Sequence, residues 1–186
     1  DSVPGDTSTS IVGMGAHLAN QLRSKGIETI HHTEVFDYIN GKLDRSKAYQ
    51  LAEKSVRKIL KQYPSIEVVI DLHRDGVPET THLVTEIDGK QCGKIMFFNG
   101  LSRTKTQGEI AYLKNPYLQD NLAFSFQMQM AALEYYPGLT RKNYLNGYRY
   151  NMHLRGKTLL VELGAQTNTV EEIKNAIGPL AHILDI

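Results

Sequence analysis

Two short, nearly continuous apolar runs constrain the fold of this chain most strongly. They cover residues 66–72 and 158–163. Runs of this length and character are typical of strands that a sheet buries on both faces. The second run contains an acidic residue, Glu162, and a carboxylate in a buried strand is costly unless it is paired, protonated or bound to a metal.

Amphipathic segments alternate with these runs. Apolar residues at helical spacing predict helices over 11–22, 48–61, 122–133 and 173–184, and Thr169 and Glu172 have the spacing of a capping box before the last one. A short strand is expected at 27–30, and segments 81–87 and 90–98 flank Asp88-Gly89, a pair typical of a hairpin turn. Together they predict an α/β domain, with a mixed, mostly parallel sheet, helices on both faces and an inserted β-hairpin.

Composition excludes several classes of protein. The 186 residues carry 21 Lys and Arg against 20 Asp and Glu, a net charge of +1 that argues against a nucleic-acid partner. Cys92 is the single cysteine, so the chain has no disulfide framework or Cys-rich zinc ribbon. The apolar runs are far shorter than the roughly 20 residues of a membrane-spanning helix.

Two polar stretches follow or interrupt the predicted strands, where α/β proteins place their sites. His73 follows the first strand with Asp71 and Asp75 on either side, and either acid could orient a metal-binding imidazole. Glu162 is the second candidate. Each candidate also has a structural explanation. Glu162 could be present only to form an ion pair with Arg74, and a histidine at a strand end is often hydrogen-bonded without binding a metal.

The other histidines are weaker candidates. His31 and His32 are adjacent and point to opposite sides of an extended segment, so they cannot easily share one ion. His153 precedes the Glu162 strand and could reach the same site. The chain has no Gly-rich phosphate loop, no G-x-S-x-G and no H-E-x-x-H, and Cys92 lacks the basic surroundings of a nucleophile.

A longer set of motifs resembles a known family. The stretch 68–76, which contains Asp-Leu-His-Arg-Asp, is followed by Tyr150-Asn151, by the Val-Glu-x-Gly motif at 161–164 and by Asn168-Thr169. These motifs resemble those of the stage II sporulation protein P family, which belongs to the zinc-dependent N-acetylmuramoyl-L-alanine amidases. The resemblance covers essentially the whole chain.

The resemblance implies a zinc (Zn) cofactor with His73 as one ligand and Glu162 as the catalytic residue. Arg74 or Asn151 would stabilise an oxyanion or hold a substrate carboxylate. It implies cleavage of the amide between N-acetylmuramic acid and L-alanine in peptidoglycan, with a possible stem-peptide endopeptidase activity, during septal thinning and engulfment. Family members act outside the cytoplasmic membrane at the sporulation septum, held by an N-terminal anchor, with a stage II sporulation protein D-like lytic enzyme and sporulation membrane proteins as partners.

One departure from the family affects the metal site. The family has a His-Thr-His stretch and a Glu upstream of its first helix, and nothing before Ile11 matches them. The stretch 31–34 mimics this pattern but follows the first helix. We therefore expect residues 1–186 to form a single amidase-like catalytic domain that lacks its N-terminal strand, the ligands on it and the anchor, and that is itself inactive.

Two other functions remain open on the sequence. One is a zinc carboxypeptidase-like peptidase, which would use an H-x-x-E pair and an arginine that binds a terminal carboxylate. The other is a non-catalytic cell-wall binding domain, in which His73 and Glu162 would be structural.

Overall fold

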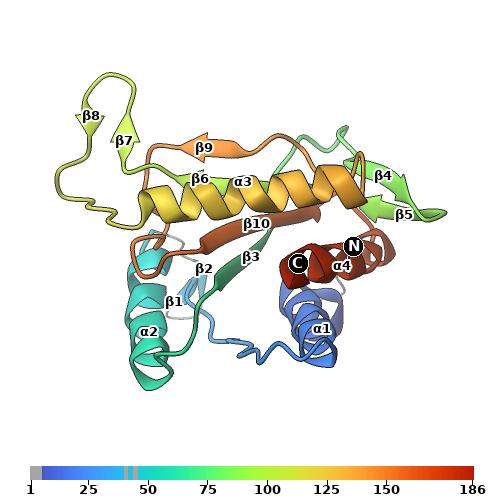
Figure 1. The fold of residues 1–186 in the computed structure, drawn as a ribbon, viewed down its shortest axis with the longest axis horizontal. Helices are drawn as coiled ribbons and strands as arrows, with labels where there is room; N and C mark the ends of the chain where they lie inside the picture. Colours follow the sequence, from blue (N-terminus) through green and yellow to red (C-terminus); the bar gives the residue numbers. More distant parts are fainter. Residues whose placement is uncertain (1–5, 40–41, 44–45) are drawn as a thin grey trace.

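A four-stranded mixed sheet lies at the centre of the molecule (Figure 1). The computed structural model describes residues 6–39, 42–43 and 46–186. Its helices are η1 (Thr7–Thr9), α1 (Ile11–Ser24), α2 (Ala48–Gln62), α3 (Leu118–Tyr135) and α4 (Val170–Asp185). The central sheet contains β3 (Val69–Asp75), β6 (Ile95–Gly100), β9 (Tyr144–Asn146) and β10 (Thr158–Ala165). Three further two-stranded pairs are β1 (Tyr38–Ile39) with β2 (Lys42–Leu43), β4 (Val84–Ile87) with β5 (Lys90–Gly93), and β7 (Arg103–Thr104) with β8 (Gly108–Glu109).

The strand order of the central sheet is β3-β10-β6-β9. β3 is parallel to β10, β10 is antiparallel to β6, and β6 is parallel to β9. This arrangement confirms the predicted α/β class and the mixed, mostly parallel sheet. The β4–β5 pair confirms the inserted hairpin, with Asp88 and Gly89 at positive φ in its turn.

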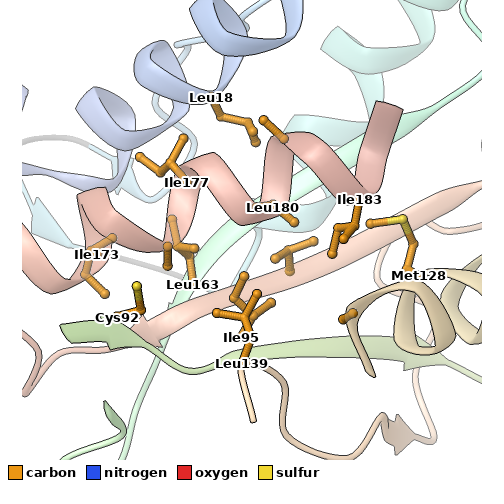
Figure 2. Packing of buried hydrophobic residues seen from close by; sticks show 14 of the residues in the cluster. Leu18, Cys92, Ile95, Met128, Leu139, Leu163, Ile173, Ile177, Leu180 and Ile183 are labelled. Atoms are coloured by element: carbon orange, nitrogen blue, oxygen red, sulfur yellow. The ribbon is translucent and has the colours of Figure 1, made fainter. Parts of the chain in front are cut away.

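Alternation along the strands divides the core between the two faces of the sheet. Leu159, Val161 and Leu163 of β10 face the main cluster, which they share with α1, α3 and α4. Figure 2 shows Ile173, Ile177 and Leu180 of α4 packed over this face, between Leu18 of α1 and the strands. Burial of each such side chain stabilises the fold by about 1.5–3 kcal/mol, so α4 holds this face together.

The opposite face carries a smaller cluster of Met96, Phe98, Leu160 and Met152, with Tyr150 packed against it. α2 reaches this side through Tyr49, whose ring lies 5.4 Å from that of Tyr150. This second face is the one on which Glu162 lies, because Glu162 follows Leu160 by two residues.

Two predicted strands differ in the structure. Residues 27–30 form no strand because the end of α1 uses their backbone: Ile27 N–H donates to Leu22 O, and Thr29 O accepts from the Arg23 guanidinium. The second hairpin arm, predicted over 90–98, divides at Lys94. Its N–H donates to Leu83 O, and Ile95 then begins β6 in the central sheet.

The side chains of two elements, β3 and α2, are less buried than their sequences predict. β3 pairs only with β10 among the described residues, and every residue of β3 is half-buried, although its apolar run predicts a central strand. α2 has the clearest amphipathic pattern, yet none of its residues is buried. Both elements therefore leave apolar surface partly open.

Candidate active site

The strand pairing brings the two main candidates together. Glu162 of β10 lies directly opposite His73 of β3 in the parallel register. Ile70 and Leu72 pack against the main core, so alternation places Asp71, His73 and Asp75 on the other face, with Glu162. The two strands thus bring His73 and Glu162, which the sequence indicates as separate candidates, to neighbouring positions on one face of the sheet.

His73 and Glu162 differ in their hydrogen bonding. His73 Nε2 lies 2.8 Å from Asp71 Oδ1, which fixes the imidazole through a carboxylate. Glu162 Oε2 is buried and has no hydrogen-bond partner in the described part of the chain.

Burial dominates the ionisation of Glu162. It raises the pKa of Glu162 to about 7, with the positive charge of His73 and of Arg141 opposing the shift and the negative charges of Asp75 and Asp71 adding to it. A carboxyl group with a pKa near 7 can both accept and return a proton at neutral pH. Glu162 is therefore equipped for general acid–base chemistry.

A different arginine from the expected one influences the charge of Glu162. Alternation along β3 places Arg74 on the same face as Leu72, away from His73 and Glu162. Arg141 instead donates from Nη1 to Asp75 Oδ2 at 2.6 Å, and its charge lowers the pKa of Glu162. Sequence reasoning missed Arg141 because it lies 66 residues from its partner Asp75, in a loop without a distinctive motif.

Asn151 lies near the site but uses its amide group on the backbone. Its Nδ2 donates to Tyr49 O at 2.8 Å, which joins the loop before β10 to the start of α2. Burial, followed by the charge of Asp71 and contributions from Tyr150 and Glu162, raises the pKa of the Tyr49 phenol. Tyr49, a second residue that the sequence did not indicate, is thus a neutral hydroxyl within the field of Asp71 and Glu162.

The remaining histidine candidates lie in separate environments. His31 lies against Gly15 of α1, and His32 stacks on Phe36 and contacts Glu34. His153 is nearly buried and binds Glu53 of α2 at 3.2 Å. Burial lowers the pKa of His153 although the bond to Glu53 opposes this, which favours a neutral structural imidazole.

The sequence also predicts that Cys92 is not a nucleophile. Cys92 is buried within the main core (Figure 2), and burial raises the pKa of its thiol. A raised pKa disfavours the thiolate, so this thiol is unsuited to nucleophilic catalysis.

The donors at the site do not complete a metal centre by themselves. Among residues 6–39, 42–43 and 46–186, no three or more His, Cys, Asp or Glu side chains are grouped so that they could hold a metal ion. Catalytic zinc sites use about three protein ligands. His73, already oriented by Asp71, fits the role of one ligand, but the described residues do not supply the full set.

The fold and these groups define a class of protein: a mixed α/β domain in which a carboxyl group and an imidazole lie opposite each other on two parallel strands. A family model described as stage II sporulation protein P matches residues 2–185. The chain belongs to the stage II sporulation protein P family, and it is therefore the chain of a sporulation protein.

A curated relative supports this assignment. Stage II sporulation protein P of Bacillus subtilis (strain 168) is 23% identical over 184 residues, which cover 95% of this chain and 43% of the relative. The chain thus spans less than half the length of that protein. Among the described residues, no helix has the length and apolar character needed to cross a membrane.

Proposed function

We propose that this domain hydrolyses peptidoglycan by cleaving the amide between the lactyl group of N-acetylmuramic acid and the L-alanine of the stem peptide. The observation that carries the proposal is the half-buried Glu162, which lies directly opposite the imidazole of His73 and has a pKa of about 7. Its Oε2 atom is buried and has no hydrogen-bond partner among the described residues. Membership of the stage II sporulation protein P family supports the same assignment.

Glu162 performs the proton transfers in this proposal. Its carboxylate takes a proton from the attacking water and passes it to the leaving stem-peptide nitrogen as the amide C–N bond breaks. Its position on β10 limits the movement of Glu162, and its partial burial strengthens the effect of nearby charges on each proton transfer. His73 lies on the neighbouring strand, where the carboxylate of Asp71 holds its imidazole.

Zinc is the cofactor of this proposal, with His73 as one of its ligands. When bound, zinc would polarise the scissile carbonyl and activate the water. The described residues supply too few donors for the ion, so the other ligands would come from outside them. Among the described residues, β3 pairs with a strand on one side only and α2 has no buried residue, which supports a further strand in this region.

The biological setting is part of the same proposal. The domain would act outside the cytoplasmic membrane at the sporulation septum, during septal thinning and engulfment, held there by an anchor on a longer polypeptide. A stage II sporulation protein D-like lytic enzyme and sporulation membrane proteins would be its partners. A second activity on stem-peptide cross-links would use the same site, since both reactions hydrolyse an amide.

Digestion of purified peptidoglycan by the full-length protein tests the proposal. We expect released stem peptides to carry a new N-terminal L-alanine, detected by mass spectrometry, and the glycan to keep its intact lactyl groups. A chelator should stop the release and added zinc should restore it. Binding to peptidoglycan without release of any peptide would instead favour a non-catalytic cell-wall binding domain, and release of single C-terminal residues would favour a carboxypeptidase.

A further inference from the structure

Arg141 is held in place at both its backbone and its side chain. Its N–H donates to Ile95 O at 2.7 Å, next to the bridge between Ile95 and Thr140 that ties this loop to β6. Its Nη1 donates to Asp75 Oδ2 at 2.6 Å, and both side chains remain partly exposed. The guanidinium is therefore fixed beside the site and still open to solvent.

Most of the hydrogen-bonding capacity of Arg141 is unused. A guanidinium has five N–H donors, and the single side-chain hydrogen bond of Arg141 within the described part of the chain uses Nη1. The Nε and Nη2 groups form a two-donor edge whose spacing matches the two oxygens of a carboxylate. Neutralising Asp75 alone would not require that edge.

The charges around Arg141 determine which ligand it can serve. Asp71, Asp75 and Glu162 are all acidic and lie on the same face of the sheet. An anionic group on a substrate would be repelled there unless a cation received it. Arg141 is bound to Asp75 on this face, and its positive charge lowers the pKa of Glu162. It can therefore receive such a group near the general base.

We propose that Arg141 binds a carboxylate of the stem peptide through its Nε and Nη2 groups while Asp75 holds Nη1. The substrate class is then an acidic peptide, and the site prefers stem peptides with a free carboxylate over amidated ones. This inference rests on the proposed function, which it deepens by assigning a residue that selects the substrate.

Binding of a dipeptide fragment of the product tests Arg141 without requiring turnover. L-alanyl-D-glutamate and its diamide are titrated into the full-length protein by calorimetry. We expect the wild-type protein to bind the acid at least about tenfold more tightly than the diamide, as a charged hydrogen bond predicts. Arg141→Gln should weaken binding of the acid by about 10- to 100-fold and leave binding of the diamide unchanged.

Three further variants separate substrate binding from a structural role. Lys142→Gln removes the same charge from the neighbouring exposed residue and should keep the preference for the acid. Arg141→Lys keeps the charge without the two-donor edge and should lose about tenfold in affinity for the acid. Asp75→Asn should preserve at least part of the preference if Arg141 binds the ligand itself, whereas complete loss on Asp75→Asn with retention on Arg141→Gln would assign the carboxylate to another group and overturn the proposal.

The inference and the proposed function fail in distinguishable ways. Equal binding of acid and diamide by the wild-type protein, binding of neither, or an unchanged preference in folded Arg141→Gln overturns the role of Arg141, even if peptidoglycan is still digested. Loss of the preference in Arg141→Gln supports that role even if digestion is not observed. Thermal unfolding of each variant shows that the proteins compared are folded.

Discussion

At the scale of single residues, Glu162 is distinguished from the other carboxylates of the site by the partner it lacks. Asp71 is bound to His73 and Asp75 to Arg141, whereas Glu162 Oε2 is buried without a partner in the described part of the chain. A buried polar atom without a partner costs about 1–3 kcal/mol of stability. Such a group is therefore expected mainly where its chemistry is needed. This cost favours a functional over a structural interpretation of Glu162.

Replacing Glu162 by glutamine should separate these two interpretations. Glu162→Gln keeps the shape of the side chain and removes proton transfer, so we expect the full-length protein to lose about 10²- to 10⁴-fold in rate of peptide release. Zinc content and the unfolding temperature should stay near those of the wild-type protein. A variant that unfolds but retains full specific activity in its folded fraction would establish a structural role instead.

Metal analysis of histidine variants tests the assignment of His73. In the full-length protein, His73→Ala should remove most of the bound zinc and abolish activity, because a catalytic zinc site depends on each of its few ligands. The matched control is the double replacement of His31 and His32 by alanine, which removes two imidazoles from outside the site. Full zinc occupancy in His73→Ala, or loss of zinc in the control, would refute the assignment.

The residues of the site were predictable where strands position them. His73 and Glu162 follow from two apolar runs and the rule that sites gather at strand ends, since the parallel register then places them opposite each other. Arg141 and Tyr49 lie on a loop and a helix, and they reach the site through long-range contacts that leave no local pattern. The apolar run predicts a strand that ends at residue 72, whereas β3 continues to Asp75. Because His73 and Arg74 are both within the strand, they lie on opposite faces.

At the scale of elements, the local signals with a defined hydrogen-bond pattern were the reliable ones. The capping box at Thr169 and Glu172 is present at the start of α4. The strand expected at 27–30 is wrong because a hydrogen-bonded helix end and a short strand draw on the same backbone groups, and the helix end uses them here. The buried fraction of α2 depends on what covers it, which periodicity cannot show.

The start of α4 gives a prediction on the pH dependence of stability. Burial alone would raise the pKa of Glu172, but hydrogen bonds from Asn168, His82 and the Thr169 backbone lower it below its ordinary value of 4.5. The ionised carboxylate therefore stabilises the fold above about pH 4.5, and this contribution is lost as the pH falls below that value.

Denaturant unfolding of Glu172→Gln measures this contribution. We expect the variant to be less stable than the wild-type protein at pH 7 by about 0.5–2 kcal/mol, as for loss of a helix cap. The difference should shrink toward pH 3 as Glu172 becomes protonated. Glu171→Gln, in the same first turn but outside the capping box, is the control, and an equal pH-dependent loss in it would contradict the assignment.

At the scale of the whole molecule, one end of the sheet is less complete than the other. β10 and β6 are buried on both faces by the main cluster and the smaller cluster around Phe98. β3, which carries His73, is half-buried throughout and is an edge of the described sheet. Stability thus resides in α1, α4 and the inner strands, and the candidate site lies where the cover is thinner.

Residues 1–186 produced alone should fold without stable zinc and leave peptidoglycan undigested. The buried core is sufficient for folding, but the described residues lack the donors for the metal. An exposed edge at β3 should also favour association. Circular dichroism, metal analysis and light scattering check these outcomes, and release of stem peptides that a chelator stops and zinc restores would contradict the prediction.

The opposition of Glu162 and His73 in the parallel register has a consequence for sequence variation. Side chains on a strand alternate between faces, so inserting or deleting one residue between Thr158 and Glu162 would turn the carboxyl group into the apolar core beneath α4. A change of length in the loop before β3 leaves this phase intact, because the backbone hydrogen bonds between β3 and β10 set the register. Insertions and deletions among members of this family should therefore lie outside these two strands. The sequence separation from Val69 to His73 and from Thr158 to Glu162 should stay at four residues.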